Sequence, residues 1–214
     1  MTTDKERLDM RIVTMVVLGL SLLLPSVKAG EFNPVLDIKD PAPKWTALPA
    51  TDGKRYAFED FKDHDVLVVV FTCNSCPYAV DYEDRLVTFA KEAKDSNVAL
   101  VAINVNKVEE DLLPAMKERA KQKGFNFPYL FDETQEIAKK YGAGYTPEFF
   151  VLNKERQIVY MGAMDDSTDA DKVTVRYLEL AVAAAKEGKL PAKQETVAIG
   201  CRIRIERARR DRSK

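Results

Sequence analysis

The sequence predicts an α/β domain with a central mixed sheet flanked by helices. Two apolar runs, 65–71 and 98–106, show no polar alternation, which is typical of strands covered on both faces. Segments with helical periodicity lie between such runs, and this alternation favours parallel strands joined by helices. Two further runs, 148–153 and 158–164, flank the charged link 154–156, as in an antiparallel hairpin. The sheet is therefore expected to be parallel in its first half and antiparallel at its end.

Each expected element has a local signal. Asp52-Gly53, between two short alternating segments, predicts a hairpin turn. Apolar residues recur on one helical face of 77–94, and the helices 111–124 and 133–142 each end at a glycine that can serve as the C-cap. The expected elements are a hairpin in 45–61, strands over 65–71, 98–106, 127–132, 148–153 and 158–164, and helices over 77–94, 111–124, 133–142 and 171–188.

The segment 197–205 alternates apolar residues with small or basic ones, and this period of two predicts a further strand. Cys201 falls on the apolar side of that strand, so we expect it to be buried and unreactive. The alternative is that the tail folds back and Cys201 acts as a third thiol, which exchanges with Cys73 and Cys76. The basic residues that follow are expected to form a solvated tail.

The composition is that of one globular domain with tails. The chain has 214 residues, of which 46% are apolar and 31% are charged, and its formal net charge is −1. This charge indicates neither a nucleic-acid binder nor a strongly acidic partner. The expected division is a signal peptide over 1–29, an extended segment over 30–44, the main domain over 45–190, and a C-terminal strand and basic tail over 191–214.

The N-terminus carries a predicted export signal. The apolar run 12–24 has the length of a signal-peptide core, and Val27-Lys28-Ala29 fits a cleavage site after Ala29. A start at Met10 places Arg11 directly before the run and fits a signal better than the mixed charges upstream. The run is shorter than the ~20 residues of a spanning helix. We therefore expect a periplasmic or secreted protein, and the alternative is a membrane anchor that is not cleaved.

The motif Cys73-Asn74-Ser75-Cys76 stands between a predicted buried strand and a predicted helix. A cysteine at a helix N-terminus meets unpaired N–H groups and the helix dipole, which favour its thiolate. We assign that place and the role of nucleophile to Cys73, and expect Cys76 to resolve the mixed disulfide. This chemistry implies a protein thiol or disulfide as substrate and a redox partner protein. It implies no metal and no organic cofactor.

A second signal is the stretch "GAGYTPEFFVL", in which Pro147 comes just before a predicted strand. In a dithiol oxidoreductase a cis proline at this place faces the reactive cysteine and keeps a strand edge free for an extended substrate. Tyr145 and Thr146 are the candidate substrate-binding residues. Glu148 is the candidate acid–base group, and the alternative is an exposed strand residue. The two phenylalanines that follow Glu148 are expected to lie in the core.

From about residue 41 to residue 188 the chain resembles the thioredoxin-like superfamily. Within it, the chain is similar to the redoxin group, which includes TlpA/ResA-like exported thiol–disulfide proteins and peroxiredoxins. The shared features are the "APKWTALPATDGK" opening, the strand leading into "CNSCPY", the insertion at 111–132, and "LFDETQEIAKKYGAGYTPEFFVLN". "CNSCPY" and the late "GCRI" resemble a bacterial subgroup with a C-N-x-C-P-Y motif. The resemblance implies a three-layer fold, a Cys73/Cys76 redox pair and Thr146-Pro147 as the cis-proline element.

Three other functions stay open at this point. A peroxide-reducing antioxidant would use the same cysteine, but peroxiredoxins carry Thr or Ser three residues before it, where this chain has Val70. A zinc site would have to combine Cys73, Cys76, Cys201 and His64, which include no second closely spaced pair. A binding module without turnover would keep the motif as a structural disulfide, although so short a loop gives it little entropic stabilisation.

Overall fold

The computed structural model describes residues 30–206, and its centre is a five-stranded sheet with the strand order β5-β4-β3-β7-β8. The strands β3, β4 and β5 run parallel, whereas β7 is antiparallel to β3 and β8 is antiparallel to β7. The predicted mixed sheet is therefore confirmed. Its strands are β3 (Val66–Phe71), β4 (Val98–Asn104), β5 (Tyr129–Phe131), β7 (Glu148–Leu152) and β8 (Ile158–Gly162).

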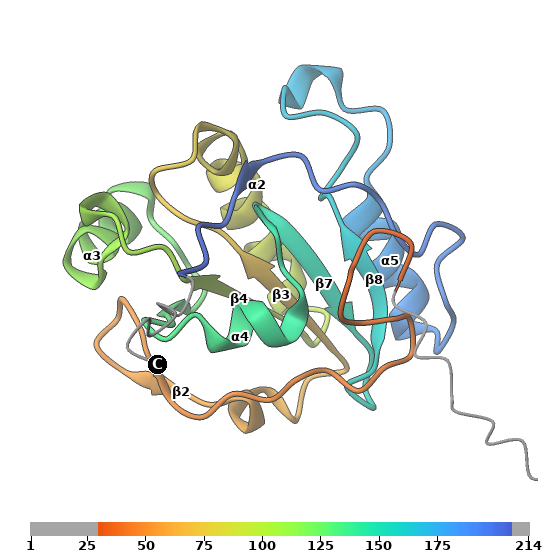
Figure 1. Ribbon diagram of the computed structural model, residues 1–214. Helices are drawn as coiled ribbons and strands as arrows, with labels where there is room; N and C mark the ends of the chain where they lie inside the picture. Colours follow the sequence, from red (N-terminus) through yellow and green to blue (C-terminus); the bar gives the residue numbers. More distant parts are fainter. Residues whose placement is uncertain (1–29, 207–214) are drawn as a thin grey trace, which may run out of the picture.

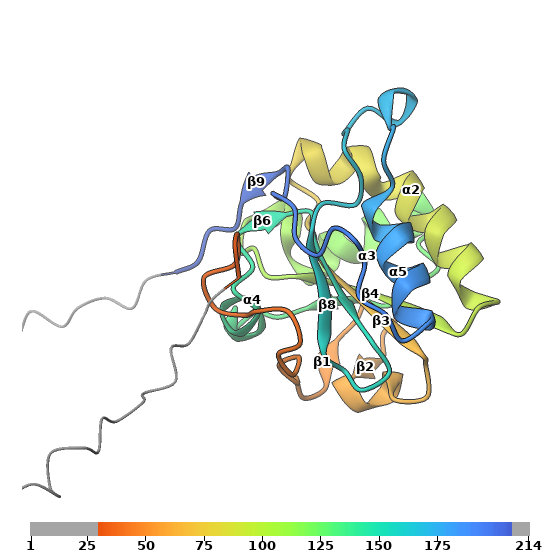
Figure 2. The ribbon, with the colours of Figure 1, turned by 90° about the vertical axis from the view of Figure 1, so that its right-hand side faces the viewer.

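Helices lie on both faces of this sheet (Figure 1). Figure 2 shows α2, α3 and α5 on one side of the strands, and α4 with the N-terminal segment on the other. The helices are α2 (Pro77–Lys94), α3 (Leu113–Lys123), α4 (Glu136–Tyr141) and α5 (Tyr177–Lys186). Outside the main sheet lie the two-residue strands β1 (Leu48–Pro49), β2 (Arg55–Tyr56), β6 (Tyr145–Thr146) and β9 (Cys201–Arg202). Short 3₁₀ turns are η1 (Phe58–Phe61), η2 (Glu109–Asp111) and η3 (Ala170–Lys172).

Several local predictions are confirmed. β1 and β2 form an antiparallel hairpin around Gly53, whose φ of 83° needs the conformational freedom of glycine. Gly124 and Gly142 end α3 and α4 in the left-handed conformation, each with φ of 64°. Phe149 and Phe150 are both fully buried, as expected for core residues.

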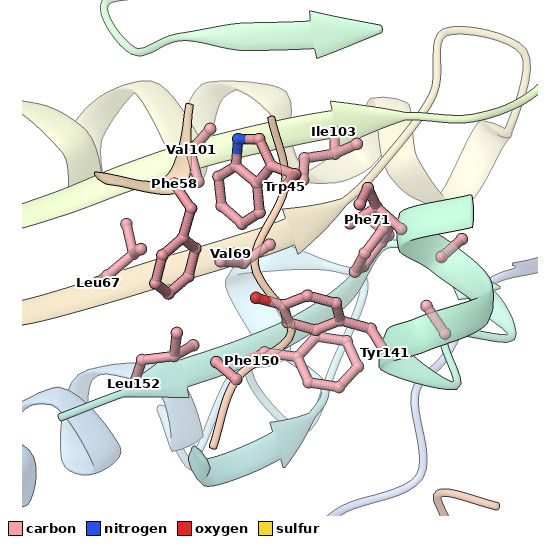
Figure 3. Packing of buried hydrophobic residues seen from close by; sticks show 14 of the residues in the cluster. Trp45, Phe58, Leu67, Val69, Phe71, Val101, Ile103, Tyr141, Phe150 and Leu152 are labelled. Atoms are coloured by element: carbon pink, nitrogen blue, oxygen red, sulfur yellow. The ribbon is translucent and has the colours of Figure 1, made fainter. Parts of the chain in front are cut away.

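The central strand β3 is buried on both faces, which explains its uninterrupted apolar sequence. Its even-numbered valines pack in one cluster with α2 and α5, through residues such as Tyr82 and Leu178. Its odd-numbered side chains pack on the other face, in a cluster that contains Trp45, Tyr141 and Phe150 (Figure 3). Two-sided burial of this kind is typical of a sheet between helical layers. The packing on both faces fixes the position of the C-terminal end of β3, after which the cysteine motif begins.

The last helix begins later than the sequence predicts. α5 starts at Tyr177, whereas the helical pattern indicated a start near residue 171. The carboxylate of Asp166 accepts hydrogen bonds from the backbone N–H groups of Thr174 and Val175, at 2.9 and 3.0 Å. These bonds hold the β-branched run before α5 in a loop, because a side-chain acceptor offers the backbone an alternative to the helical ladder.

The C-terminal strand is much shorter than expected. Only Cys201–Arg202 pairs as a strand, and its partner β6 has only two residues. Val197 and Ile199 are 57% and 38% exposed, so the apolar side of the predicted strand is not continuously buried. The reason is that the segment pairs with the short β6 rather than with the main sheet. Ile203, in contrast, is buried in the core cluster that contains Trp45.

Two predictions lie outside the described residues: the signal peptide over 1–29 and the basic end over 207–214. Within residues 30–206, no helix has both the length and the apolar character needed to cross a bilayer.

Candidate active site

The cysteine motif lies in the loop between β3 and α2, and Cys76, not Cys73, lies at the helix N-terminus. Pro77 is the first residue of α2, and Cys76 is its N-cap with φ of −90° and ψ of 118°. The residue before a proline is disfavoured in the helical conformation, so α2 cannot begin earlier. The assignment of Cys73 to the helix N-terminus was therefore wrong. Cys73 lies three residues upstream, and both cysteines are free and buried.

Thr146 joins the two cysteines from the other side. The Thr146-Pro147 peptide bond is cis, as predicted. The hydroxyl oxygen of Thr146 lies 3.3 Å from the Cys73 sulfur. Its carbonyl oxygen accepts a hydrogen bond from the Cys76 thiol at 3.1 Å. One buried residue of the cis-proline element thus contacts both members of the pair.

The edge of β6 is not free, in contrast to the expectation from the sequence. β9 pairs with it antiparallel, with Thr146 opposite Cys201 and Tyr145 opposite Arg202 (Figure 2). The Arg202 guanidinium lies 5.6 Å from the centre of the Tyr145 ring. The backbone N–H of Cys201 donates to the Cys76 sulfur at 3.4 Å. Cys201 is half-buried and packs against the pair, so it is less buried than the sequence predicted.

Asp111 is a site residue that the sequence analysis missed. Its side chain is fully buried. Its carboxylate accepts from the backbone N–H groups of Asn74 and Ser75 at 2.7 and 3.0 Å, and from the Ser75 hydroxyl at 2.5 Å. It also accepts from the Asn106 amide at 3.2 Å. One carboxylate therefore holds the loop between the two cysteines, a role for which the flanking acidic sequence gave no specific signal.

The two cysteines differ in electrostatic environment. The pKa of Cys76 is lowered, chiefly by hydrogen bonding with the Cys73 thiol and further by Cys201 and the backbone N–H of Ala79, although burial opposes the shift. The Thr146 carbonyl favours the thiol and opposes this lowering in part. The pKa of Cys73 is raised, because it donates to Cys76, is buried, and lies near the negative Asp111. The two thiols are therefore coupled: one donates to the other, and ionisation of either thiol raises the pKa of its partner.

Glu148 is buried rather than exposed. One of its carboxylate oxygens accepts from the backbone N–H groups of Gly144 and Tyr145, at 2.7 and 2.9 Å. Burial raises the pKa of this carboxyl, although these two hydrogen bonds oppose the shift. Among the hydrogen bonds of residues 30–206, none joins Glu148 to a cysteine. Its two hydrogen bonds hold the turn that leads into Pro147.

A cavity of about 540 Å³ opens beside the cysteines. All three cysteines line it, and the side chains of Lys107, Glu110, Arg202 and Arg204 add three positive charges and one negative charge. Glu206 forms an ion pair with Lys107 at 2.8 Å, so the excess positive charge at the opening comes from Arg202 and Arg204 of the C-terminal segment. His64, the remaining candidate zinc ligand, lies beside Phe61 and lines a separate cavity.

We predict that Asp111→Ala lowers the free energy of unfolding by about 3 kcal/mol, because buried N–H groups lose a charged acceptor. Asp111→Asn is the matched control, since it keeps the shape and one acceptor oxygen. It should cost less stability and should lower the pKa of Cys73 by removing the nearby charge. Urea unfolding and thiol titration of the reduced proteins measure both effects. An unchanged stability in Asp111→Ala would contradict the role given to Asp111.

Comparison with known proteins agrees with this geometry. The Redoxin family model matches residues 37–178. A thiol-disulfide oxidoreductase ResA from Bacillus cereus is 25% identical over 159 residues, which cover 72% of this chain and 87% of that protein. The crystal structure of an uncharacterized conserved protein from Geobacillus kaustophilus has a TM-score of 0.75 at 36% identity, and the match covers 82% of this chain and 96% of that one.

The fold has more distant counterparts. The solution structure of a thioredoxin-like protein in its oxidized form has a TM-score of 0.60 at 18% identity, over 72% of this chain and 99% of that one. At this identity the likeness concerns the fold alone. Since the Redoxin family model spans most of the described domain, including the loop with both cysteines and the cis proline, the chain belongs to the redoxin family and has a thioredoxin-like fold.

Proposed function

We propose that this protein is an exported thiol–disulfide oxidoreductase that exchanges electrons with protein thiols or disulfides through Cys73 and Cys76. The observation that carries the proposal is the position of Cys76. Cys76 is the N-cap of α2, and its thiol donates a hydrogen bond at 3.1 Å to the carbonyl of Thr146, the residue before the cis proline. A thiolate held beside a peptide-binding edge is suited to attack a disulfide in an extended segment.

In the reducing direction, Cys76 is the attacking thiolate. It forms a bond to one sulfur of the substrate disulfide, and the other substrate sulfur leaves as a thiolate and takes up a proton. Cys73 then loses its proton and attacks Cys76, which releases the second substrate thiol. The substrate disulfide is reduced to two thiols and the Cys73–Cys76 pair is oxidised to a disulfide. A redox partner protein must reduce that disulfide again.

The environment of Cys73 suits the resolving role. Hydrogen bonding with Cys76, burial and the nearby Asp111 charge all raise the pKa of Cys73, which favours its thiol form. This order of roles is the reverse of the one expected from the sequence, where Cys73 was the nucleophile. A raised pKa prevents Cys73 from competing for the substrate. Once Cys76 is in a mixed disulfide its negative charge is gone, and Cys73 can more readily lose its proton.

The sequence of residues 1–29 supports export, because it has the apolar core and the small residues of a cleavable signal. N-terminal sequencing of the protein recovered from outside the cytoplasm should give a chain that begins at Gly30. Recovery of a chain that keeps the apolar run would contradict cleavage and favour the membrane anchor.

Peroxide reduction by Cys76 is the competing function. In peroxiredoxins, Thr or Ser stands three residues before the reacting cysteine. In this chain the residue three positions before Cys76 is Cys73. To separate the functions, the reduced protein is mixed in a stopped-flow instrument with a model disulfide and, separately, with hydrogen peroxide. Rapid loss of thiol with the disulfide and slow loss with peroxide support the proposal. The reverse order would overturn it, and slow reaction with both would indicate a binding module.

We predict that alkylation of the reduced protein by iodoacetamide depends on pH through Cys76. Because hydrogen bonds lower its pKa, the alkylation rate should reach half of its maximum at a pH below the ~8.5 of a free thiol, and further acidification should slow it. Cys201, whose pKa is raised to about 11, stays protonated across this range. Cys73→Ala removes the main donor to Cys76 and should move the midpoint upward. A wild-type midpoint near the ~8.5 of a free thiol would contradict the assignment.

A further inference from the structure

The C-terminal segment lies where an extended substrate would bind. β9 forms an antiparallel pair with β6, the strand that ends at the cis proline. The addition of an extended peptide to an exposed strand edge is a common mode of peptide recognition. Here the added strand belongs to the same chain, and it brings a cysteine, Cys201, to the position opposite Thr146.

The fit between this segment and the site depends on a glycine. A Cβ atom at Gly200 would lie 2.1 Å from the carbonyl oxygen of Thr146 and 2.6 Å from its carbonyl carbon. These are backbone atoms that cannot move aside as a flexible side chain can. Only glycine therefore lets the segment approach the cis-proline element so closely. The residue that follows this approach is Cys201, whose backbone N–H donates a hydrogen bond to the Cys76 sulfur at 3.4 Å and whose side chain packs against the two cysteines.

Further contacts hold the segment in place. The backbone N–H of Ile203 donates to the Gly144 carbonyl at 2.9 Å, and the Ile203 side chain is buried in the core. The Gln135 amide donates to the Arg204 carbonyl at 3.0 Å and accepts from the Glu206 N–H at 2.8 Å. Gln135 itself is buried and also donates to the Val105 carbonyl at 2.8 Å. The buried side chain of Gln135 thus connects the main domain to the C-terminal segment through two hydrogen bonds.

We propose that residues 200–204 act as an internal substrate strand, and that Cys201 exchanges with the Cys73–Cys76 disulfide at the sulfur of Cys76. This inference rests on the proposed function and adds a third redox residue to it. Cys201 loses its proton and attacks Cys76. A Cys76–Cys201 bond forms, the Cys73–Cys76 bond breaks, and Cys73 leaves as a thiolate that takes up a proton. The number of disulfides does not change, so the step needs no external oxidant or reductant.

The arrangement has a consequence for external substrates. Cys76 is only 2% exposed while the strand is in place. An extended protein substrate would need the same β6 edge and the same sulfur, so it competes with the tail for both. The internal strand therefore screens the reactive sulfur until a substrate displaces it.

The test uses the Cys73→Ser protein, in which Cys76 and Cys201 are the remaining cysteines. After mild oxidation with diamide, alkylation and tryptic digestion, mass spectrometry should find the Cys76–Cys201 disulfide within a monomer. In the matched control Cys76→Ser, the Cys73–Cys201 disulfide should not form. Adding Gly200→Val to Cys73→Ser keeps both thiols but displaces the strand. It should slow closure, that is, formation of the Cys76–Cys201 disulfide, by at least about tenfold. Val197 lies before this strand and its side chain is 57% exposed, so Val197→Ala should leave the closure rate unchanged.

Free Cys201 in oxidised Cys73→Ser protein, or disulfide-linked dimers in place of the internal bond, would overturn the inference. An unchanged closure rate with Gly200→Val would overturn it too. If Gly200→Val does not fold, Gln135→Ala loosens the same segment and should slow closure likewise. The proposed function fails separately. If the wild type reduces an external disulfide but no Cys76–Cys201 bond forms, only this inference is lost. If the bond forms but no external disulfide reacts, the inference stands and the proposed function fails.

Discussion

Replacing Cys76 with serine should slow the reaction of the reduced protein with an external disulfide by at least about 100-fold, because it removes the sulfur to which we assign the first attack. Cys73 has a raised pKa and lies three residues before the helix N-cap. Cys73→Ser should behave differently, because its hydroxyl still donates to Cys76. It should react once at a rate near that of the wild type and then fail to turn over through the Cys73–Cys76 disulfide.

Stopped-flow kinetics with a single equivalent of disulfide, followed by steady-state turnover, separates these two effects. The account of the two cysteines would be wrong if Cys76→Ser kept the fast first step and Cys73→Ser lost it. That result would restore Cys73 as the nucleophile, the role that the position of the motif in the sequence suggested.

Phe150→Ala should lower the free energy of unfolding by about 3–5 kcal/mol, the range for removing a fully buried aromatic ring. Phe150 lies on β7 and is fully buried. Its ring packs edge-on against Phe71 and Tyr141, with ring centres 5.7 and 5.1 Å apart (Figure 3). The change would leave a cavity beneath the end of β3, directly before the cysteine loop.

Urea denaturation of the reduced proteins measures this effect. Phe32→Ala is the matched control, because it removes the same ring from a side chain that is 48% exposed. Its effect should be much smaller than that of Phe150→Ala. A loss below about 1 kcal/mol for Phe150→Ala would contradict the packing described for this face of the sheet.

The sequence was sufficient to predict the main sheet, because its strands have strong and simple signals. β3 is buried on both faces, and its sequence is therefore an unbroken run of apolar residues. Gly124 and Gly142 end their helices as C-caps because their positive φ angles favour glycine. The cis bond at Pro147 was expected through the resemblance to the thioredoxin-like superfamily, which has a cis proline directly before this strand.

The predictions that failed concern contacts between distant parts of the chain. The pairing of β9 with β6 joins residues 201 and 146, and no local pattern indicates it. Asp111 lies in a short acidic run, and nothing in that run shows which carboxylate turns inward to hold the cysteine loop.

The position of Cys76 at the helix N-cap did have a signal in the sequence. Pro77 disfavours a helical conformation at Cys76, and it therefore sets the start of the helix after the second cysteine. This effect of Pro77 on the preceding residue decides which sulfur lies at the N-cap.

The central claim is that Cys76 is the sulfur that bonds to the substrate. The most direct measurement traps the mixed disulfide. Protein carrying both Cys73→Ser and Cys201→Ser is mixed with a disulfide-bonded peptide, and the adduct is mapped by mass spectrometry. The account predicts a stable adduct on Cys76, because neither thiol that could resolve it remains. The reciprocal protein, with Cys76→Ser and Cys201→Ser, should form no comparable adduct. An adduct that forms readily on Cys73 in the reciprocal protein, with little on Cys76 in the first, would contradict the account.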